Sequence, residues 1–157
     1  MNELVLRRAA AADAAAVRAL TRDAYAKWVP LIGREPRPMQ ADYERAVEAH
    51  RVDLALLNGE LVGLIETIDQ PDHLLIENVA VAPAFQGRGL GRRLMAHAEQ
   101  IAAAQDHAEI RLYTNARFAE NVALYRRLGY RIDREEEGPL GVTVHMSKPV
   151  RRHASTS

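Results

Sequence analysis

The segment Glu77–Arg93, ENVAVAPAFQGRGLGRR, constrains the fold most because it joins a strand, a glycine-rich bend and a helix without any spacer. The residues Ile76, Val79 and Val81 form a short β-branched run, which is typical of a strand. Pro83 follows this run, and proline cannot donate a hydrogen bond to a sheet ladder. The sequence therefore predicts a strand that ends just before the bend.

The bend itself contains three glycines at alternating positions, Gly87, Gly89 and Gly91. Glycine allows positive φ angles and leaves the backbone amide groups accessible to a ligand. Apolar residues then recur at helical spacing from Leu90 to Ile101, so the bend opens a helix. Free amide groups and the helix dipole favour an anion such as a pyrophosphate at this point. The side chains of Arg88, Arg92 and Arg93 would surround the same point. The alternative is a plain strand-to-helix turn, with Arg92 and Arg93 on a solvated helix face.

Two common phosphate-binding patterns do not fit this bend. A dinucleotide-binding G-x-G-x-x-G pattern would need glycine at Arg92, and the chain has no G-x-x-x-x-G-K-[ST] run. Gln86, Gly89 and Gly91 instead match [QR]-x-x-G-x-[GA]. This resembles the acetyl-CoA pyrophosphate loop of the GNAT (Gcn5-related N-acetyltransferase) superfamily. The resemblance implies coenzyme A binding by Val79, Ala80, Val81, Gln86, Gly87, Arg88, Gly89, Leu90, Gly91 and Arg92.

A second informative segment is NARFAENVALYRRLGY, which spans Asn115–Tyr130. Asn121 precedes Tyr125 by four residues, so both side chains lie near the same edge of a helix. Periodicity alone also fits core packing for Tyr125 and solvent exposure for Asn121. The segment resembles the second GNAT motif, in which the asparagine contacts the pantetheine arm and the tyrosine protonates the departing thiolate. The resemblance thus implies cofactor binding by Asn121 and Tyr125, and a role for Tyr125 as general acid.

Length and composition set the class of protein. The chain has 157 residues, 21 basic and 21 acidic side chains and no cysteine. This length fits a single domain, which we place at residues 1–149, followed by a flexible tail from 150 to 157. Balanced charge and the lack of a long apolar run argue against nucleic acid and membrane partners, and the default location is cytoplasmic. The scattered histidines His73, His97, His107 and His145 show no ligand spacing, so we expect no metal site.

The order of predicted elements is β-α-α-β-β-β-α-β-α-β-β. It predicts an α/β (α+β) domain with a mixed, mostly antiparallel sheet of about seven strands and helices on both faces. Trp28–Pro38 contains three prolines and a glycine, so we expect a loop there. The predicted strands are Glu3–Arg8, Val52–Leu57, Leu61–Ile68, Leu74–Val81, Glu109–Thr114, Tyr130–Glu136 and Val142–Met146, and the predicted helices are Ala14–Lys27, Met39–His50, Leu90–Gln105 and Asn115–Leu128.

Glu77 is the candidate general base. In a regular strand it shares a face with Val79, whereas a bulge near Val79 would exchange the orientations of Glu77 and Asn78. A purely structural pairing of Glu77 with an arginine and deprotonation through an ordered water are the open alternatives. The resemblance further implies that the amides of Val79 and Val81 polarise the thioester carbonyl.

The acceptor pocket is expected between the first helix, the Trp28–Pro38 loop and the final hairpin. Arginines there would suit a carboxylate and Glu35 an ammonium group, although Trp28 would equally pack over the core. The predicted activity is transfer of the acetyl group of acetyl-CoA to a primary amine of a small molecule, by direct attack in a ternary complex. The alternatives are a peptide or protein amine and a non-catalytic acyl-CoA-binding module, and family analogy is compatible with a homodimer. The candidate acceptor residues are Tyr25, Trp28, Arg34, Glu35, Arg37 and Tyr43.

Overall fold

A seven-stranded sheet forms the centre of the chain in the computed structural model, which describes residues 3–139 and 141–151. Its spatial order is β1-β2-β3-β4-β5-β7-β6, and neighbouring strands are antiparallel except for the parallel pair β4 and β5. This confirms the predicted α+β fold. The strands are β1 (Leu4–Arg8), β2 (Arg51–Leu57), β3 (Glu60–Asp69), β4 (Leu74–Val81), β5 (Glu109–Asn115), β6 (Arg131–Gly138) and β7 (Gly141–Pro149).

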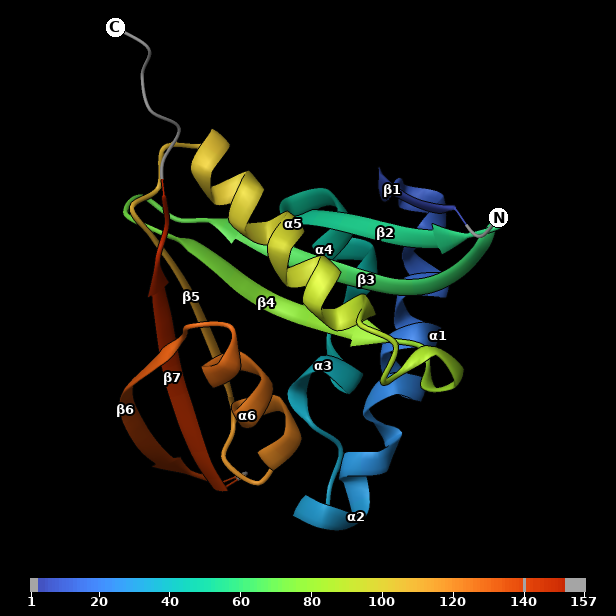
Figure 1. The fold of residues 1–157 in the computed structure, drawn as a ribbon. Helices are drawn as coiled ribbons and strands as arrows, with labels where there is room; N and C mark the ends of the chain where they lie inside the picture. Colours follow the sequence, from blue (N-terminus) through green and yellow to red (C-terminus); the bar gives the residue numbers. More distant parts are fainter. Residues whose placement is uncertain (1–2, 140, 152–157) are drawn as a thin grey trace, which may run out of the picture.

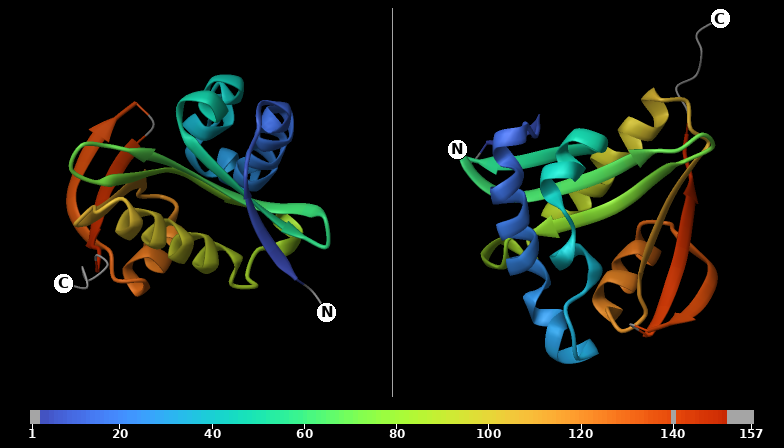
Figure 2. Two further views of the ribbon diagram at one scale, coloured as in Figure 1. Left: turned by 90° about the horizontal axis from the view of Figure 1, so that it is seen from above. Right: turned by 180° about the vertical axis from the view of Figure 1, so that it is seen from behind.

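Helices cover both faces of the sheet, as predicted. The helices α1 (Ala14–Tyr25) and α4 (Tyr43–Ala49) lie on one face, while α5 (Leu90–Ala104) and α6 (Ala119–Arg127) lie on the other (Figures 1 and 2). Each face has its own apolar core, because alternate strand residues point to opposite sides. The first core lies between the sheet and α5, where Leu94 and Ala98 are fully buried. The second core lies between the sheet and the helices α1 and α4, where Val17 of α1 is fully buried.

The segment expected as a loop, Trp28–Pro38, contains two short helices instead. The chain runs from α1 through the 3-10 turn η2 (Ala26–Trp28) into α2 (Val29–Ile32), and α3 (Arg37–Gln40) follows after a break. The prediction of a continuous loop was wrong because Pro30 stands in the first turn of α2, where its missing amide hydrogen has no partner to lose. Gly33, with φ 77°, ends that helix.

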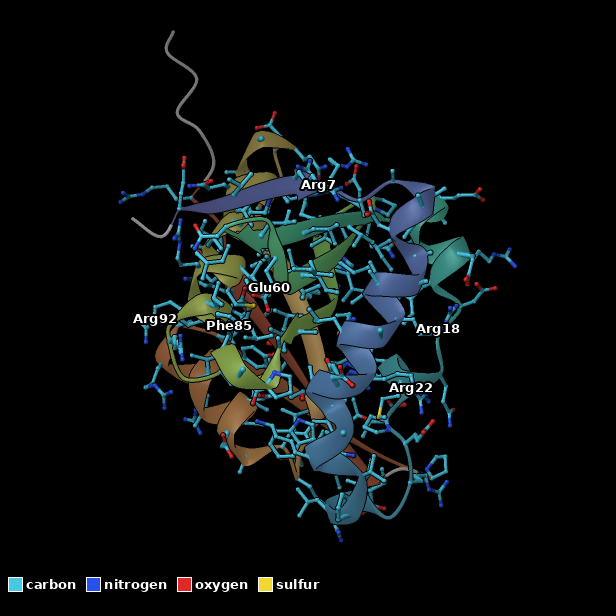
Figure 3. All side chains as sticks on the ribbon, turned by 90° about the vertical axis from the view of Figure 1, so that its right-hand side faces the viewer. Arg7, Arg18, Arg22, Glu60, Phe85 and Arg92 are labelled. Carbon is cyan, nitrogen blue, oxygen red and sulfur yellow. The ribbon has the colours of Figure 1, made fainter. Side chains whose placement is uncertain are left out.

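The second predicted helix, Met39–His50, is divided in two. Ala41 adopts an extended conformation after α3, and the side chain of Asp42 then caps α4 by accepting a hydrogen bond of 3.2 Å from the amide of Arg45. Two ion pairs join α1 to this region: Arg18 with Glu44, and Arg22 with Glu35 (Figure 3 labels both arginines). These pairs hold the α2–α4 segment beside α1.

The end of the chain and the fourth helix also differ in detail from expectation. Asn115 completes β5, and α6 begins only at Ala119. Gly129, with φ 99°, follows its end, as glycine commonly does after a helix. Val150 packs on the first core and its amide donates to the Ala108 carbonyl at 2.8 Å. The predicted tail therefore starts with a residue that is held to the domain, and its residues from 152 onward lie outside the described part.

Strand β4 separates from β5 along its second half, and this opening creates the site. The two strands pair only over Leu74–Ile76 and Ile110–Leu112, after which they diverge (Figure 1). On its other side, β4 pairs with β3 with a register shift, because Thr67 lies opposite Ile76 and Glu66 opposite Asn78. Glu77 is thus the extra residue of a β-bulge, which reorients the side chains that follow.

A buried charge cluster couples β2 to α5 and predicts an acid-sensitive contribution to stability. Asp53 is 2% exposed, lies 2.9 Å from Arg51 Nε and lies 3.5 Å from His97 Nε2. Burial raises the pKa of Asp53, but its contacts with His97 and Arg51 outweigh this and hold the pKa below its usual value. A carboxyl group with a depressed pKa stabilises the fold at pH values above its unfolded-state pKa near ~3.9. This stabilisation is lost as the pH falls through the lower pKa of the folded state.

We therefore expect Asp53→Asn to lower the free energy of unfolding at neutral pH by about 2 kcal/mol, the scale of a lost charge-assisted hydrogen bond. Its stability should also vary less between about pH 5 and pH 3 than that of the wild type. Urea unfolding at several pH values measures both effects. Asp133→Asn is the control, because the pair between Asp133 and Arg131 is exposed. Equal effects of the two variants would contradict the prediction.

Candidate active site

Two cavities meet at the diverging part of β4. The first, of about 840 Å³, lies between the α2–α4 segment and the β6–β7 hairpin, with β3, β4 and β5 as its floor. The second, of about 590 Å³, lies between the end of β4, the glycine-rich bend and α6. Among the described residues only Tyr25 lines both cavities. The two cavities therefore adjoin at Tyr25.

The glycine-rich bend is open to the second cavity. Gly87 and Gly89 have φ angles of 80° and 82°, and a Cβ atom on either would meet no heavy atom of the described residues within 4 Å. Gly89 is the N-cap of α5, so it has no side chain to accept hydrogen bonds from the first amides of that helix. The bend is thus not filled by its own side chains, and its amides and helix dipole favour an anion there.

Side chains around the bend fix its shape. The amide group of Gln86 donates to the Val81 carbonyl at 3.0 Å, and its oxygen accepts from Lys27 Nζ at 2.9 Å. Two predicted cofactor-binding residues, Arg88 and Leu90, do not line the second cavity. Arg88 lies over the Phe85 ring, 5.2 Å from its centroid, and Leu90 is buried in the core. Figure 3 shows Phe85 and Arg92 beside the bend. The predicted cofactor-binding residues that line the second cavity are Val79, Ala80, Val81, Gln86, Gly87, Gly89, Gly91, Arg92, Asn121 and Tyr125.

Tyr125 lies on α6 and is only 6% exposed, although it lines the second cavity together with Asn121. Burial raises the pKa of Tyr125 to about 12. The phenol therefore stays protonated at neutral pH, which a group that donates to a leaving thiolate requires.

Glu77 lies on the floor of the first cavity. Because of the bulge, Glu77 and Asn78 both line this cavity, whereas Val79 lines the second. Of the two alternatives for this strand, the bulged one is therefore observed, and Glu77 does not share a face with Val79. The Tyr113 hydroxyl on β5 donates to a Glu77 oxygen at 2.6 Å. Burial and this hydrogen bond raise the pKa of Tyr113, so it remains a donor to the carboxylate.

A second carboxylate, Glu66 of β3, lines the same cavity. It is 4% exposed and lies 2.6 Å from Nδ1 of His50, which also lines the cavity. Burial raises the pKa of Glu66; the contact with His50 opposes this rise, while the charge of Glu77 adds to it. The first cavity thus has two carboxylates at its floor, which suits an amine or ammonium group.

Asn78 holds the junction between the cavities in place. Its side-chain oxygen accepts a hydrogen bond from the Tyr25 hydroxyl at 2.9 Å, and its amide group lies 3.2 Å from both Thr21 Oγ1 and the Tyr43 hydroxyl. The Tyr43 hydroxyl in turn donates to the Pro38 carbonyl at 2.6 Å. This network connects α1, α4 and β4 at one buried point.

The predicted acceptor residues are only partly brought together. Tyr25, Arg37 and Tyr43 line the first cavity, but Arg34 and Glu35 do not. Glu35 is bound to Arg22 at 2.6 Å, so its charge is already neutralised.

Trp28 lines the second cavity instead, where it stacks on Phe118 with ring centroids 4.5 Å apart. Sequence reasoning missed the cavity residues Lys27, His50, Glu66, Asn78 and Tyr113.

The bend supplies a prediction with an internal control. We expect Gly89→Ala to weaken acetyl-CoA binding about tenfold, since the methyl group enters the open space at the helix N-terminus and a positive φ costs an L-residue ~1–2 kcal/mol. Gly59, with φ 82° and equally open surroundings, lies in the β2–β3 turn away from both cavities. Gly59→Ala should lose similar stability but keep its affinity in calorimetric titration. Unchanged affinity in Gly89→Ala would contradict a phosphate site in the bend.

No group of three or more His, Cys, Asp or Glu side chains in residues 3–139 and 141–151 has an arrangement able to hold a metal ion. Within the same residues, none of the helices has the length and hydropathy needed to cross a bilayer.

Comparison with known proteins identifies the class. Residues 15–130 match the model of the "Acetyltransferase (GNAT) family". The chain therefore belongs to this family of acetyltransferases, and the resemblance of its two motifs is confirmed.

Individual relatives agree with this assignment. The chain is 37% identical over 75 residues to mouse N-alpha-acetyltransferase 80, a match that covers 48% of this chain and 23% of that protein, so it spans less than a quarter of this relative. Among solved structures, the ribosomal-protein-S18-alanine N-acetyltransferase from Escherichia coli superimposes with a TM-score of 0.78, at 20% identity and 99% coverage of both chains. The PaiA N-acetyltransferase from Thermoplasma acidophilum, solved in complex with coenzyme A, superimposes with a TM-score of 0.76 at 15% identity. The superposition covers 94% of this chain and 99% of that chain.

Proposed function

We propose that the protein transfers the acetyl group of acetyl-CoA to a primary amine of a small molecule, by direct attack in a ternary complex. The observation that carries this proposal is the meeting of two cavities at β4, one with an open phosphate-binding bend and Tyr125, the other with two carboxylates at its floor. The pyrophosphate would lie at the N-terminus of α5, and the pantetheine arm would follow β4 past Asn121. The acceptor would enter through the first cavity.

The chemistry requires proton transfers at the nitrogen and at the sulfur. Glu77 takes one proton from the ammonium group, the neutral amine nitrogen forms a bond to the thioester carbonyl carbon, and the C–S bond breaks. The nitrogen loses its second proton as the amide forms, and this loss balances the proton that Tyr125 gives to the sulfur. Tyr125 donates its proton to the departing sulfur, and backbone amides of Val79 and Val81 stabilise the oxyanion. The chain contains no cysteine, so no acyl-cysteine intermediate competes with direct attack.

Release of free thiol from acetyl-CoA tests the proposal. A panel of monoamines, diamines and amino acids is offered, and thiol release above the rate without amine is the expected result for at least one of them. Mass spectrometry should then find the acetylated amine. Binding of acetyl-CoA without thiol release for any amine, including peptides, would contradict an acetyltransferase function and favour a non-catalytic acyl-CoA-binding module.

A peptide or protein amine is the second candidate acceptor. The relative that supports it is mouse N-alpha-acetyltransferase 80, at 37% identity over 75 residues, and the E. coli structure is likewise that of a protein N-acetyltransferase. Adding short peptides with free N-termini to the same panel separates the two acceptor classes. A kcat/KM for peptides above that for every small amine would favour the second candidate.

A further inference from the structure

Tyr25 occupies the position where the two proposed substrates must meet. It lines both cavities, and its hydroxyl donates to Asn78 Oδ1 at 2.9 Å and lies 3.3 Å from the Val79 carbonyl oxygen. Both partners belong to β4, immediately after the bulge at Glu77. A residue at the end of α1 is therefore fixed against the strand that separates the acceptor from the thioester.

The orientation of the Tyr25 ring is held by more than one contact. Asn78 is 3% exposed and is itself held by Thr21 and Tyr43, so the oxygen that accepts from Tyr25 has little freedom to move. Burial raises the pKa of Tyr25 well above its usual value, and the nearby Tyr125 phenol adds to the rise. Both phenols line the second cavity.

We propose that Tyr25 is a specificity-determining residue that limits the length of the transferred acyl group. The inference rests on the proposed function, in which the sulfur lies at Tyr125 and the carbonyl at the amides of β4. The acyl chain then points toward the first cavity, and Tyr25 stands in that direction. A two-carbon acyl group ends before the ring, whereas each further methylene must displace the ring or occupy the path of the amine.

Binding of acyl-CoA thioesters tests this without knowledge of the acceptor. The wild type should bind butyryl-CoA at least about tenfold more weakly than acetyl-CoA in calorimetric titration, the scale expected for a pocket that discriminates by methylene groups. Tyr25→Ala should remove most of that difference by creating space at the junction. Tyr25→Leu provides a second enlarged variant if Tyr25→Ala does not fold, as judged by circular dichroism.

Two controls separate ring volume from the polar network. Tyr25→Phe keeps the ring and should keep the preference for acetyl-CoA within about threefold. Thr21→Val removes a hydrogen bond from Asn78 without lining either cavity, and it should also keep the wild-type ratio.

The outcomes distinguish this inference from the proposed function. Folded Tyr25→Ala or Tyr25→Leu with the wild-type ratio of affinities would overturn the inference, as would a wild type that binds both thioesters equally. Neither result would affect thiol release with the amine panel. A wild type that binds neither thioester would overturn the inference and the proposed function together.

Discussion

Replacing Tyr125 with phenylalanine should lower turnover by about 10²-fold, the lower end of what a positioned general acid contributes. The affinity for acetyl-CoA should change by less than about threefold, because the ring remains in the cavity wall and only one hydroxyl is lost. Steady-state thiol release gives turnover, and calorimetric titration of acetyl-CoA gives affinity. Unchanged turnover would remove the role of Tyr125 as general acid.

The pH dependence of the wild type provides an independent test of the same role. Burial raises the pKa of Tyr125 to about 12, so the hydroxyl stays protonated throughout the neutral and mildly alkaline range. An ordinary tyrosine, with a pKa near ~10, would begin to lose its proton in that range. The rate should therefore show no decline from loss of the acid below about pH 10. A decline near pH 9 that is absent in Tyr125→Phe would contradict the raised pKa.

Tyr130 offers a matched control for Tyr125→Phe. Its ring lies 6.2 Å from that of Tyr125, and its buried hydroxyl has no hydrogen-bond partner among the described residues. It does not line either cavity. Tyr130→Phe should therefore keep wild-type turnover, and a loss equal to that of Tyr125→Phe would indicate that packing rather than the Tyr125 proton explains the effect.

The parts of the fold that were predicted correctly are those with a local cause. Alternation identifies the strands, and apolar spacing identifies α5. Asn58 and Gly59, both at positive φ, form the β2–β3 turn, which is the conformation that an Asn-Gly pair favours. The bend was also recognisable, because its alternating glycines and the helix that follows are contiguous in sequence. These features are decided within a few residues, so one sequence is sufficient.

The errors and omissions have non-local causes. The bulge at Glu77 depends on how β4 aligns with β3, and no pattern within β4 reveals it. Glu66 and His50 are 16 residues apart, and Tyr113 and Glu77 are 36 residues apart, so only the assembled sheet joins them. The pairing of Arg22 with Glu35 likewise removed a candidate acceptor residue.

Replacing Glu77 with glutamine should lower kcat/KM at neutral pH by about 10²-fold, since the amide cannot accept the proton of the ammonium group. Glutamine keeps the size of the side chain and can still accept the hydrogen bond from Tyr113. The fold should thus be preserved. Glu135→Gln is the control for the change in charge, because Glu135 is exposed on β6 and lines neither cavity.

The pH profile of Glu77→Gln distinguishes a lost base from a damaged site. An alkylamine with a pKa near ~10.4 is only about 0.1% free amine at pH 7.4, and this fraction rises about tenfold per pH unit. Without its base the enzyme depends on that fraction, so kcat/KM of the variant should rise with a slope near one up to the pKa of the amine, while the wild type should rise less steeply. A variant that is equally impaired at every pH would indicate that Glu77 positions the acceptor. Wild-type activity at neutral pH would exclude Glu77 as the base and leave Glu66, on the same cavity floor, as the next carboxylate to test.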